Sequence, residues 1–211
     1  MQAYLRQIVD LKPDTTIPYD EVISWAADKL KEQMDGFKCN PETRGIYLAT
    51  LDSGAAASVA FWENALEQGP GFANPAHFPL TLANSSAAII SRLLNIQGPN
   101  YTLSGSSEAL YAAFCQAIYD LSSIDESVEE CLVLAIDVSE NSRCVGMLME
   151  SSNSKSSLGM ITEAAEVQEH DDPQPVDSPT LAMRVFVNNC LEHRETFLKT
   201  GEGKICFAKY D

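Results

Sequence analysis

A short strand that leads directly into a long helix is the feature that most constrains the fold of this chain. The turn signal Gln97-Gly98-Pro99 precedes a β-prone run from Asn100 to Ser104. Gly105-Ser106-Ser107-Glu108 follows, and apolar residues at helical spacing then continue from about Ser107 to Leu121. A strand and a helix joined by so short a turn are a building unit of α/β proteins, so the sequence predicts that fold class.

Strand and helix patterns also alternate along the rest of the chain. Predicted helices cover 19–34, 52–66, 83–94 and 178–198, and predicted strands cover 44–51, 132–138, 144–150, 158–163 and 203–210. The small residues that open the segment 52–66 suit a helix that packs closely against a neighbouring element. We expect one domain over residues 1–211, because a chain of 211 residues that is 45% apolar can bury a sizeable core.

The predicted helix 178–198 carries clear signals at both ends. Ser178-Pro179 is a favoured start, because the serine hydroxyl caps free amides and proline suits the first turn. Its apolar positions are Leu181, Val185, Leu191 and Phe197. Gly201 supplies the stop signal, so we expect one helix up to Leu198 and then a terminal strand.

The charge balance excludes several classes of partner. The chain has 30 acidic and 14 basic residues, for a net charge of −16. An acidic surface repels nucleic acids and anionic membranes, so we expect neither as a partner. No apolar run reaches the roughly 18 residues of a membrane span, and the N-terminal residues lack the apolar core of a signal peptide. We expect a cytoplasmic protein.

The cysteines and histidines predict neither a metal site nor a cofactor. The six cysteines lie far apart, with no Cys-x-x-Cys pair, and are expected to be buried, reduced thiols. The three histidines lack the spacing of metal ligands. We expect His77, in a proline-rich loop, to line a tunnel or lie at the surface. His170 and His193 are expected to be solvated.

The segment from Thr50 to about Asp125 resembles the β-ketoacyl synthases, the condensing enzymes of fatty-acid and polyketide synthesis. The residues that match the family's pattern, in order and in register, are Gly54, Pro75, Phe78, Pro79, Thr81, Asn84, Ile90-Ser91, Gly98 and Pro99. The resemblance implies a thiolase-like α/β fold with a mixed central sheet flanked by helices, truncated to roughly the N-terminal half of a ketosynthase. The ketosynthase-like core covers about 44–138, and a divergent, shortened part covers 139–211.

The cysteine that holds the acyl chain in that family is absent here. Ser107 stands at its position, with Gly105, Ser106 and Glu108 as neighbours. Condensation needs a thiolate at a helix N-terminus, and a serine hydroxyl needs a separate base to react. The family's histidine motifs, His-Gly-Thr-Gly-Thr and Asn-Ser-Phe-Gly, do not occur in this sequence either. We therefore expect that the chain has no catalytic residues. Ser107 and Glu108 are expected to form an ordinary helix N-terminus, in which the serine caps the helix and the glutamate complements its dipole.

The half-length chain-length factors fit these departures. The turn Gly-Ser-Ser-Glu-Ala-Leu resembles the Gly-Gly-Glu-Ala-Ser-Phe turn of these proteins, which accompany a full-length ketosynthase in type II polyketide systems, including those that make aryl polyene pigments. The resemblance implies a pseudoenzyme that forms a heterodimer with a ketosynthase. It would contribute to the 3-oxoacyl-(acyl-carrier-protein) synthase activity of that partner and would meet the acyl carrier protein through it.

Two groups of residues carry this role in the resemblance. The strand that pairs across the ketosynthase twofold axis matches the expected partner interface, Asn100, Tyr101, Thr102, Leu103 and Ser104. The residues expected to line or limit the acyl tunnel are Asp52, Ala55, Ala56, Val59, His77, Phe78 and Thr81. The small alanines would leave room for a longer chain, and Val59 or Phe61 would form a wall.

Two other functions stay open. Ser107 could be the nucleophile of an acyltransferase or hydrolase, although Gly-Ser-Ser lacks the second glycine of a Gly-x-Ser-x-Gly elbow. The chain could also be a stand-alone scaffold or regulator that binds acyl groups or carrier protein. Phe61 and Trp62 fit a core or a partner interface. The acidic segment 163–177 fits a solvated loop, or a surface that repels an acidic carrier protein.

Overall fold

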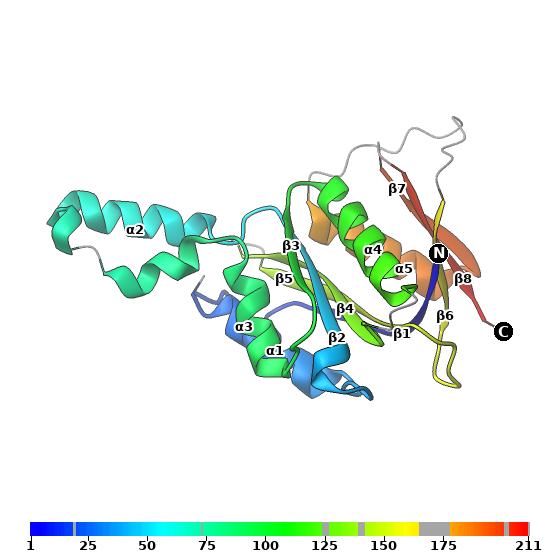
Figure 1. Ribbon diagram of the computed structural model, residues 1–211. Helices are drawn as coiled ribbons and strands as arrows, with labels where there is room; N and C mark the ends of the chain where they lie inside the picture. Colours follow the sequence, from blue (N-terminus) through cyan, green and yellow to red (C-terminus); the bar gives the residue numbers. More distant parts are fainter. Residues whose placement is uncertain are drawn as a thin grey trace.

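The computed structural model describes residues 1–18, 20–72, 74–123, 127–138, 142–164, 178–200 and 203–210. These residues form one eight-stranded sheet with helices on both faces (Figure 1). The strands are β1 (Gln2–Leu11), β2 (Arg44–Thr50), β3 (Asn100–Ser104), β4 (Glu130–Asp137), β5 (Arg143–Glu150), β6 (Gly159–Ala164), β7 (Glu195–Lys199) and β8 (Lys204–Lys209). The helices are α1 (Val22–Gln33), α2 (Ala55–Gln68), α3 (Ser85–Leu94), α4 (Ser107–Leu121) and α5 (Pro179–Glu192), with short 3-10 helices η1 (Pro41–Thr43), η2 (Pro70–Phe72) and η3 (Pro75–Thr81).

The sheet is mixed, as the sequence predicted. Its strand order is β3-β2-β4-β5-β1-β6-β8-β7. β2 pairs in parallel with both β3 and β4, whereas the other neighbouring pairs are antiparallel. β3 and β7 are therefore the two edges of the sheet, and the parallel strands lie at the β3 edge.

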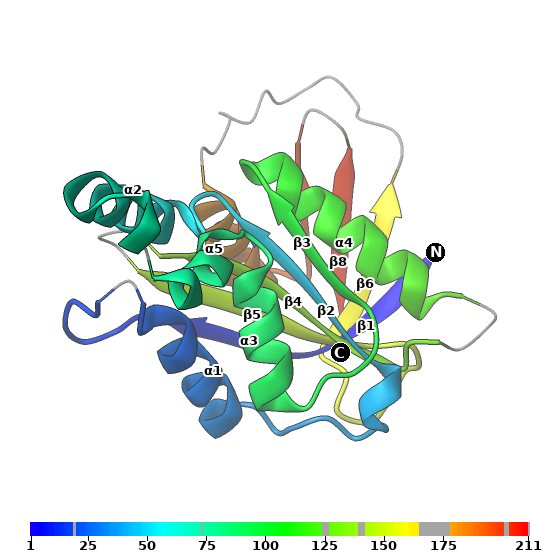
Figure 2. The same cartoon turned by 60° about the vertical axis from the view of Figure 1, so that its left-hand side comes forward.

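The parallel strands β2 and β4 are buried on both faces, because helices cover each side of the sheet. Tyr47 and Val133 belong to the core beneath α4 and α5, whereas Ile46 and Leu134 belong to the core beneath α1 and α3. Figure 2 shows α1 and α3 side by side in front of the sheet. Burial on both faces explains the nearly continuous apolar runs that identified these strands in the sequence.

The first strand, β1, changes face along its length. A register irregularity lies between Leu5 and Gln7, so Leu5 joins the α4–α5 core while Val9 joins the α1–α3 core. At the irregularity Arg6 is buried, and its guanidinium pairs with the buried carboxylate of Glu130 on β4. Removing one partner of such a pair leaves an uncompensated buried charge, so this contact holds β1 in the sheet.

α2, η2 and η3 form an arm, residues 55–72 and 74–81, that projects from the body of the protein (Figure 1). Ala65 is the one buried residue of α2 among the described residues. The helix packs on η3 through an edge-to-face contact between Phe61 and Phe78, whose ring centroids lie 6.1 Å apart. Most of α2 is therefore not packed against the body of the protein.

The close packing expected of the small residues that open this segment occurs at the base of the arm. Gly54 has a φ of +85°, in the left-handed region that favours glycine. A Cβ atom at Gly54 would lie 2.6 Å from the carbonyl oxygen of Thr81. Ser58 Oγ donates a hydrogen bond to the carbonyl oxygen of Gly54 at 2.8 Å. The two ends of the arm thus meet at this glycine.

The structure corrects the prediction for the C-terminal helix. Ser178 caps α5 as expected, accepting the Leu181 N–H at 3.3 Å, but the helix ends at Glu192. The segment that follows forms β7, because pairing with β8 overrides the helical pattern. The predicted apolar positions Leu181, Val185, Leu191 and Phe197 are about half exposed. The residues of α5 that enter the core are Pro179, Thr180, Ala182, Met183, Phe186, Val187 and Cys190.

The other predicted elements agree with the structure to within a few residues, and β3 and α4 agree at both ends. The sequence patterns did not predict β1. The stop signal Gly201 and residues 165–177 of the acidic segment lie outside the described residues. Within the described ranges, no helix is long and apolar enough to cross a membrane.

Gly54→Ala should loosen the arm. The left-handed backbone and the contact with the Thr81 carbonyl both oppose a side chain, so we expect the free energy of unfolding to fall by about 2 kcal/mol. Urea denaturation measures this loss, and limited proteolysis should cleave the arm of the variant faster.

Gly71→Ala, in η2 of the same arm, is the matched control because a Cβ atom there meets nothing within 4 Å. We expect this substitution to change the free energy of unfolding by less than about 0.5 kcal/mol. Equal stability of the two variants would contradict the importance of the Gly54–Thr81 contact.

Candidate functional site

The predicted partner strand β3 is an edge of the sheet. It pairs with β2 on one side and with no described strand on the other. Asn100, Tyr101 and Ser104 are exposed, whereas Thr102 and Leu103 are half-buried. An edge strand of this kind presents unpaired backbone N–H and C=O groups, so the geometry leaves β3 available to another strand.

Tyr101 is the large aromatic side chain on this edge. The residue is 44% exposed, and its ring stacks on that of Tyr47, with centroids 5.6 Å apart. Tyr47 is buried, and its hydroxyl donates a hydrogen bond to Asp120 Oδ2 at 2.6 Å. Burial raises the pKa of Tyr47, so the phenol remains a donor near neutral pH. The Tyr47–Asp120 pair therefore supports Tyr101 from beneath.

Ser107, which the sequence resemblance places at the family's cysteine position, lies in the first turn of α4. Ser107 is 7% exposed, and its Oγ donates to Glu108 Oε2 at 3.5 Å. The capping residue is Ser106 rather than Ser107, and its side chain makes no capping bond, so the predicted serine cap is wrong. Ser106 Oγ donates to Glu108 Oε2 instead. This bond is the main cause of the lowered pKa of Glu108, which is exposed enough to complement the helix dipole.

The environment of Ser107 does not resemble that of an activated nucleophile. Its hydrogen-bond partner, Glu108, is a weak base because its pKa is lowered. His77 is exposed on η3 and His193 is exposed after α5, and neither is hydrogen-bonded to Ser107 within the described residues. His170 lies outside the described residues.

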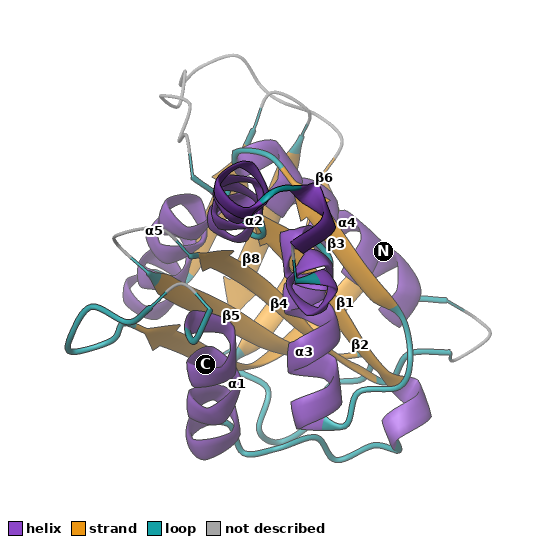
Figure 3. Cartoon of the chain, turned by 90° about the vertical axis from the view of Figure 1, so that its left-hand side faces the viewer, coloured by secondary structure: helices purple, strands orange, loops and turns teal. Residues whose placement is uncertain are grey.

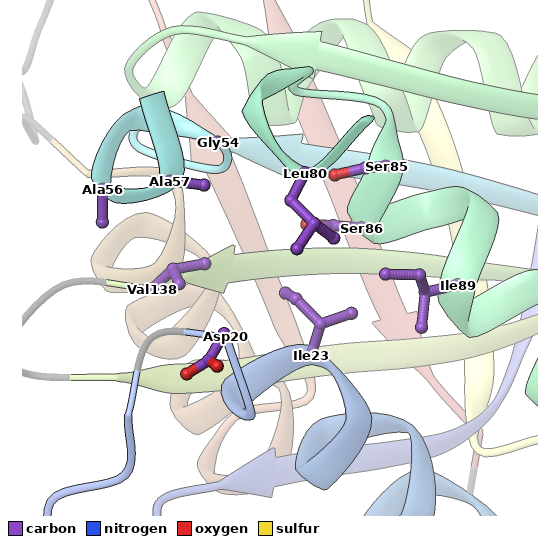
Figure 4. Close-up of a pocket in the computed structure, with 10 residues that line it drawn as sticks. All are labelled: Asp20, Ile23, Gly54, Ala56, Ala57, Leu80, Ser85, Ser86, Ile89 and Val138. Carbon is purple, nitrogen blue, oxygen red and sulfur yellow. The ribbon is translucent and has the colours of Figure 1, made fainter. Parts of the chain in front are cut away.

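The predicted tunnel residues at the base of the arm lie near the carboxyl ends of β2 and β4. Asp52 follows β2, and its Oδ1 accepts the backbone N–H of Val138 at 2.9 Å. Val138 follows β4, so this bond ties the ends of the two parallel strands together. Ala56, in the first turn of α2, lines a pocket beside Val138 (Figure 4).

The remaining predicted tunnel residues lie on the arm itself. Ala55 and Val59 of α2 are exposed, and so are His77 and Phe78 of η3. Thr81 is half-buried, and its Oγ1 donates to the Phe78 carbonyl at 2.7 Å. The structure therefore brings one of the seven predicted residues, Ala56, into the pocket and leaves most of the others on the outside of the arm.

A pocket lies at the base of the arm (Figure 4). It is lined by Asp20, Ile23, Gly54, Ala56, Ala57, Leu80, Ser85, Ser86, Ile89 and Val138. These residues come from α1, α2, η3, α3 and the segments next to them. Sequence reasoning missed most of them, because they lie far apart in the chain and no local pattern groups them.

The chemistry of the pocket is mainly apolar. Ser86 Oγ is bonded to Ser53 Oγ at 2.5 Å, and Ser53 Oγ also donates to the Ala83 carbonyl at 3.2 Å. The Ser86 hydroxyl therefore has a partner in the protein. Asp20 is the single charged residue among the described lining residues, and it is exposed (Figure 4). Such a lining suits a hydrocarbon group better than a charged one.

The cysteines take no part in this site. All six are free thiols, of which Cys131, Cys144 and Cys190 are buried, as predicted, and the other three are half-buried. Burial raises the pKa of Cys144 and Cys190 to about 12, so neither thiol ionises near neutral pH. The described part of the chain contains no group of three or more His, Cys, Asp or Glu residues that could hold a metal ion.

Comparisons with known proteins identify the fold. No protein-family model and no curated protein sequence matches the chain. Among solved structures, the chain is similar to the ishigamide ketosynthase/chain length factor, with a TM-score of 0.52 and 13% identity over 65% of this chain and 44% of that chain. It is also similar to the ketosynthase ApeO in complex with its chain length factor ApeC from Xenorhabdus doucetiae, with a TM-score of 0.54 and 12% identity over 77% of this chain and 61% of that chain. The chain thus spans about half the length of these structures and has their thiolase-like α/β fold, as the sequence resemblance implied.

Proposed function

We propose that this chain is a non-catalytic subunit of the chain-length-factor type. It would pair with a full-length ketosynthase and shape the acyl tunnel of that enzyme during chain elongation. The growing chain would be a type II polyketide similar to an aryl polyene, or a chain similar to a fatty acid. Elongation would take place on an acyl carrier protein that meets the partner. The observation that carries the proposal is a ketosynthase-type fold that leaves β3 as an open edge and buries Ser107, the residue that the sequence resemblance aligns with the family's nucleophile.

The β3 edge supports pairing with another subunit. Backbone groups of Asn100 to Ser104 can extend the sheet across an interface, and no charged side chain lies within this strand. Tyr101 adds a half-exposed aromatic ring held by Tyr47. Aromatic residues that are already ordered contribute strongly to interfaces, because little side-chain entropy is lost on binding.

The pocket supports a role in accommodating an acyl chain. Ala56 and Ala57 present small side chains to it, and Ile23, Ile89 and Val138 supply apolar walls. A hydrocarbon tail that reaches this pocket would gain about 0.8 kcal/mol for each buried methylene. The width left by the alanines would then limit how much of the tail can enter.

The alternative of a serine-dependent enzyme has less support. Ser107 is buried and bonded to an acidic side chain, whereas a serine nucleophile needs a nearby base to take its proton.

The chain and a ketosynthase encoded beside it should form a stable 1:1 complex on co-expression. A chain that stays monomeric, with a ketosynthase that elongates normally without it, would rule out the proposed function.

Tyr101→Ala should weaken that complex. Truncating an aromatic residue at the centre of an interface costs about 2 kcal/mol, so the dissociation constant should rise roughly 30-fold. Isothermal titration calorimetry with the purified ketosynthase measures this change.

Tyr210→Ala is the matched control. Tyr210 is 39% exposed and stacks on Tyr4 with centroids 6.5 Å apart, but it follows β8 on the far side of the sheet from β3. If both substitutions weaken the complex equally, β3 is not the contact.

Ser107→Ala separates the proposed subunit from a serine enzyme. We expect the amount and length of the elongated product to stay unchanged, because the hydroxyl takes no part in chemistry. The assay is reconstituted elongation with the ketosynthase and carrier protein, analysed by mass spectrometry, and omission of the ketosynthase is the control. Loss of product in the Ser107→Ala complex would favour the enzyme instead.

Ala56→Leu should shorten the product. Three added carbon atoms would occupy the pocket, so we expect the main product to lose roughly one two-carbon unit while the complex still forms. Ala60→Leu, one turn further along α2 and outside the pocket lining, should leave product length unchanged. An unchanged product in both variants would exclude the pocket as the site of length control.

A further inference from the structure

The middle of this chain is almost free of positive charge. Between Arg44 and Arg143 the sequence contains a single Lys or Arg, Arg92. The same stretch holds eleven acidic residues, which are Asp52, Glu63, Glu67, Glu108, Asp120, Asp125, Glu126, Glu129, Glu130, Asp137 and Glu140. The arm, β3 and α4 all belong to this stretch. Exposed carboxylates of this stretch, such as those of Glu63 and Glu67 on the arm, therefore have almost no positive charge near them in the sequence.

The outer face of α2 combines this charge with exposed apolar side chains. Val59, Trp62 and Leu66 are 57%, 65% and 80% exposed and follow each other at helical spacing, so they form one stripe along the helix. Glu63 and Glu67 lie beside that stripe, four residues apart, and both are exposed. We call these five residues the arm face.

The arm face is costly for the isolated chain. Two like charges four residues apart on a helix repel each other and weaken it. Three large apolar side chains in water forgo the free energy that burial would supply. Helix α2 packs through its opposite side on η2 and η3, and Figure 1 and Figure 2 show it standing away from the sheet. No contact within the described body of the protein accounts for this choice of residues.

We propose that the arm face docks into a groove of the partner ketosynthase that has an apolar floor and a rim of lysine or arginine side chains. The apolar stripe would enter the groove, while Glu63 and Glu67 would meet the basic rim. This inference rests on the proposed function and adds the chemistry of the partner's contacting surface.

Charge complementarity selects this occupant over two others. A second copy of this chain would bring the same carboxylates and a single cation, Arg92, from this stretch, so like charges would oppose pairing through the arm. An acidic protein or an anionic membrane would be repelled in the same way. The negative charge of the arm thus favours the heterodimer over self-association. Repulsion between like charges is one way in which an interface excludes wrong partners.

The test compares binding of a full-length ketosynthase from the same organism to three forms of the full chain. These are the native sequence, the double variant Glu63→Gln with Glu67→Gln, and the control Asp28→Asn with Glu192→Gln, which removes two exposed charges from α1 and α5. Association and dissociation rates are measured by surface plasmon resonance at 50 mM and 500 mM NaCl. Circular dichroism verifies that each variant keeps its helix content. We expect no loss, because glutamine and glutamate have similar helix propensities.

At low salt, the arm variant should associate about tenfold more slowly than the native chain, and high salt should remove most of that difference. The control should behave like the native chain. Trp62→Ala should raise the dissociation constant roughly 30-fold at both salt concentrations, because it acts through apolar contact.

The outcomes separate this inference from the proposed function. If the complex forms but the arm variant binds like the native chain at both salt concentrations, the basic rim is wrong and the proposed function stands. If Trp62→Ala binds normally, the apolar groove is wrong. If the native chain and the control both fail to bind the ketosynthase, the proposed function fails and this inference fails with it.

Discussion

Burial of β2 and β4 on both faces is the constraint on which the rest of the structure depends. Alternate side chains of these parallel strands enter two separate cores, so helices must cover both sides of the sheet. α4 and α5 meet this requirement on one face, and α1 and α3 meet it on the other. With these four helices on the two faces, β3 lies at the edge of the sheet, and α2 extends outward as the arm, toward the viewer in Figure 3.

The arm depends on this core only through its base. Gly54 lets the chain leave β2 in a left-handed conformation and pass close to Thr81, and Asp52 fixes the adjacent end of β4 through Val138. The pocket forms between these contacts and Ile23 of α1. Its position is thus set by the same strand ends that start the arm. A change in how the arm is held would therefore alter the pocket as well.

The sequence predicted those parts of the fold that local chemistry determines. The turn before Asn100 and the small residues after Ser104 fixed both ends of β3 and the start of α4. Local patterns failed where distant pairing decides the outcome. Phe197 continues a helical spacing, yet it lies on β7 because β8 supplies hydrogen-bond partners. The pocket could not be predicted from local patterns either, because Ile23 and Val138 become neighbours only in the folded chain.

The start of α4 is covered by other parts of the chain, whereas the apolar side chains of the arm are exposed. Near Ser107, Tyr111 donates to Glu163 of β6 at 3.2 Å, and Gly203 next to β8 packs directly on the Tyr111 ring. Residues from the C-terminal third of the chain thus cover the helix face next to Ser107. Trp62, in contrast, is 65% exposed, and none of the described residues covers it in a comparable way. The described residues thus close the helix face beside Ser107 and leave the apolar side chains of the arm exposed, where only contact with another molecule could bury them.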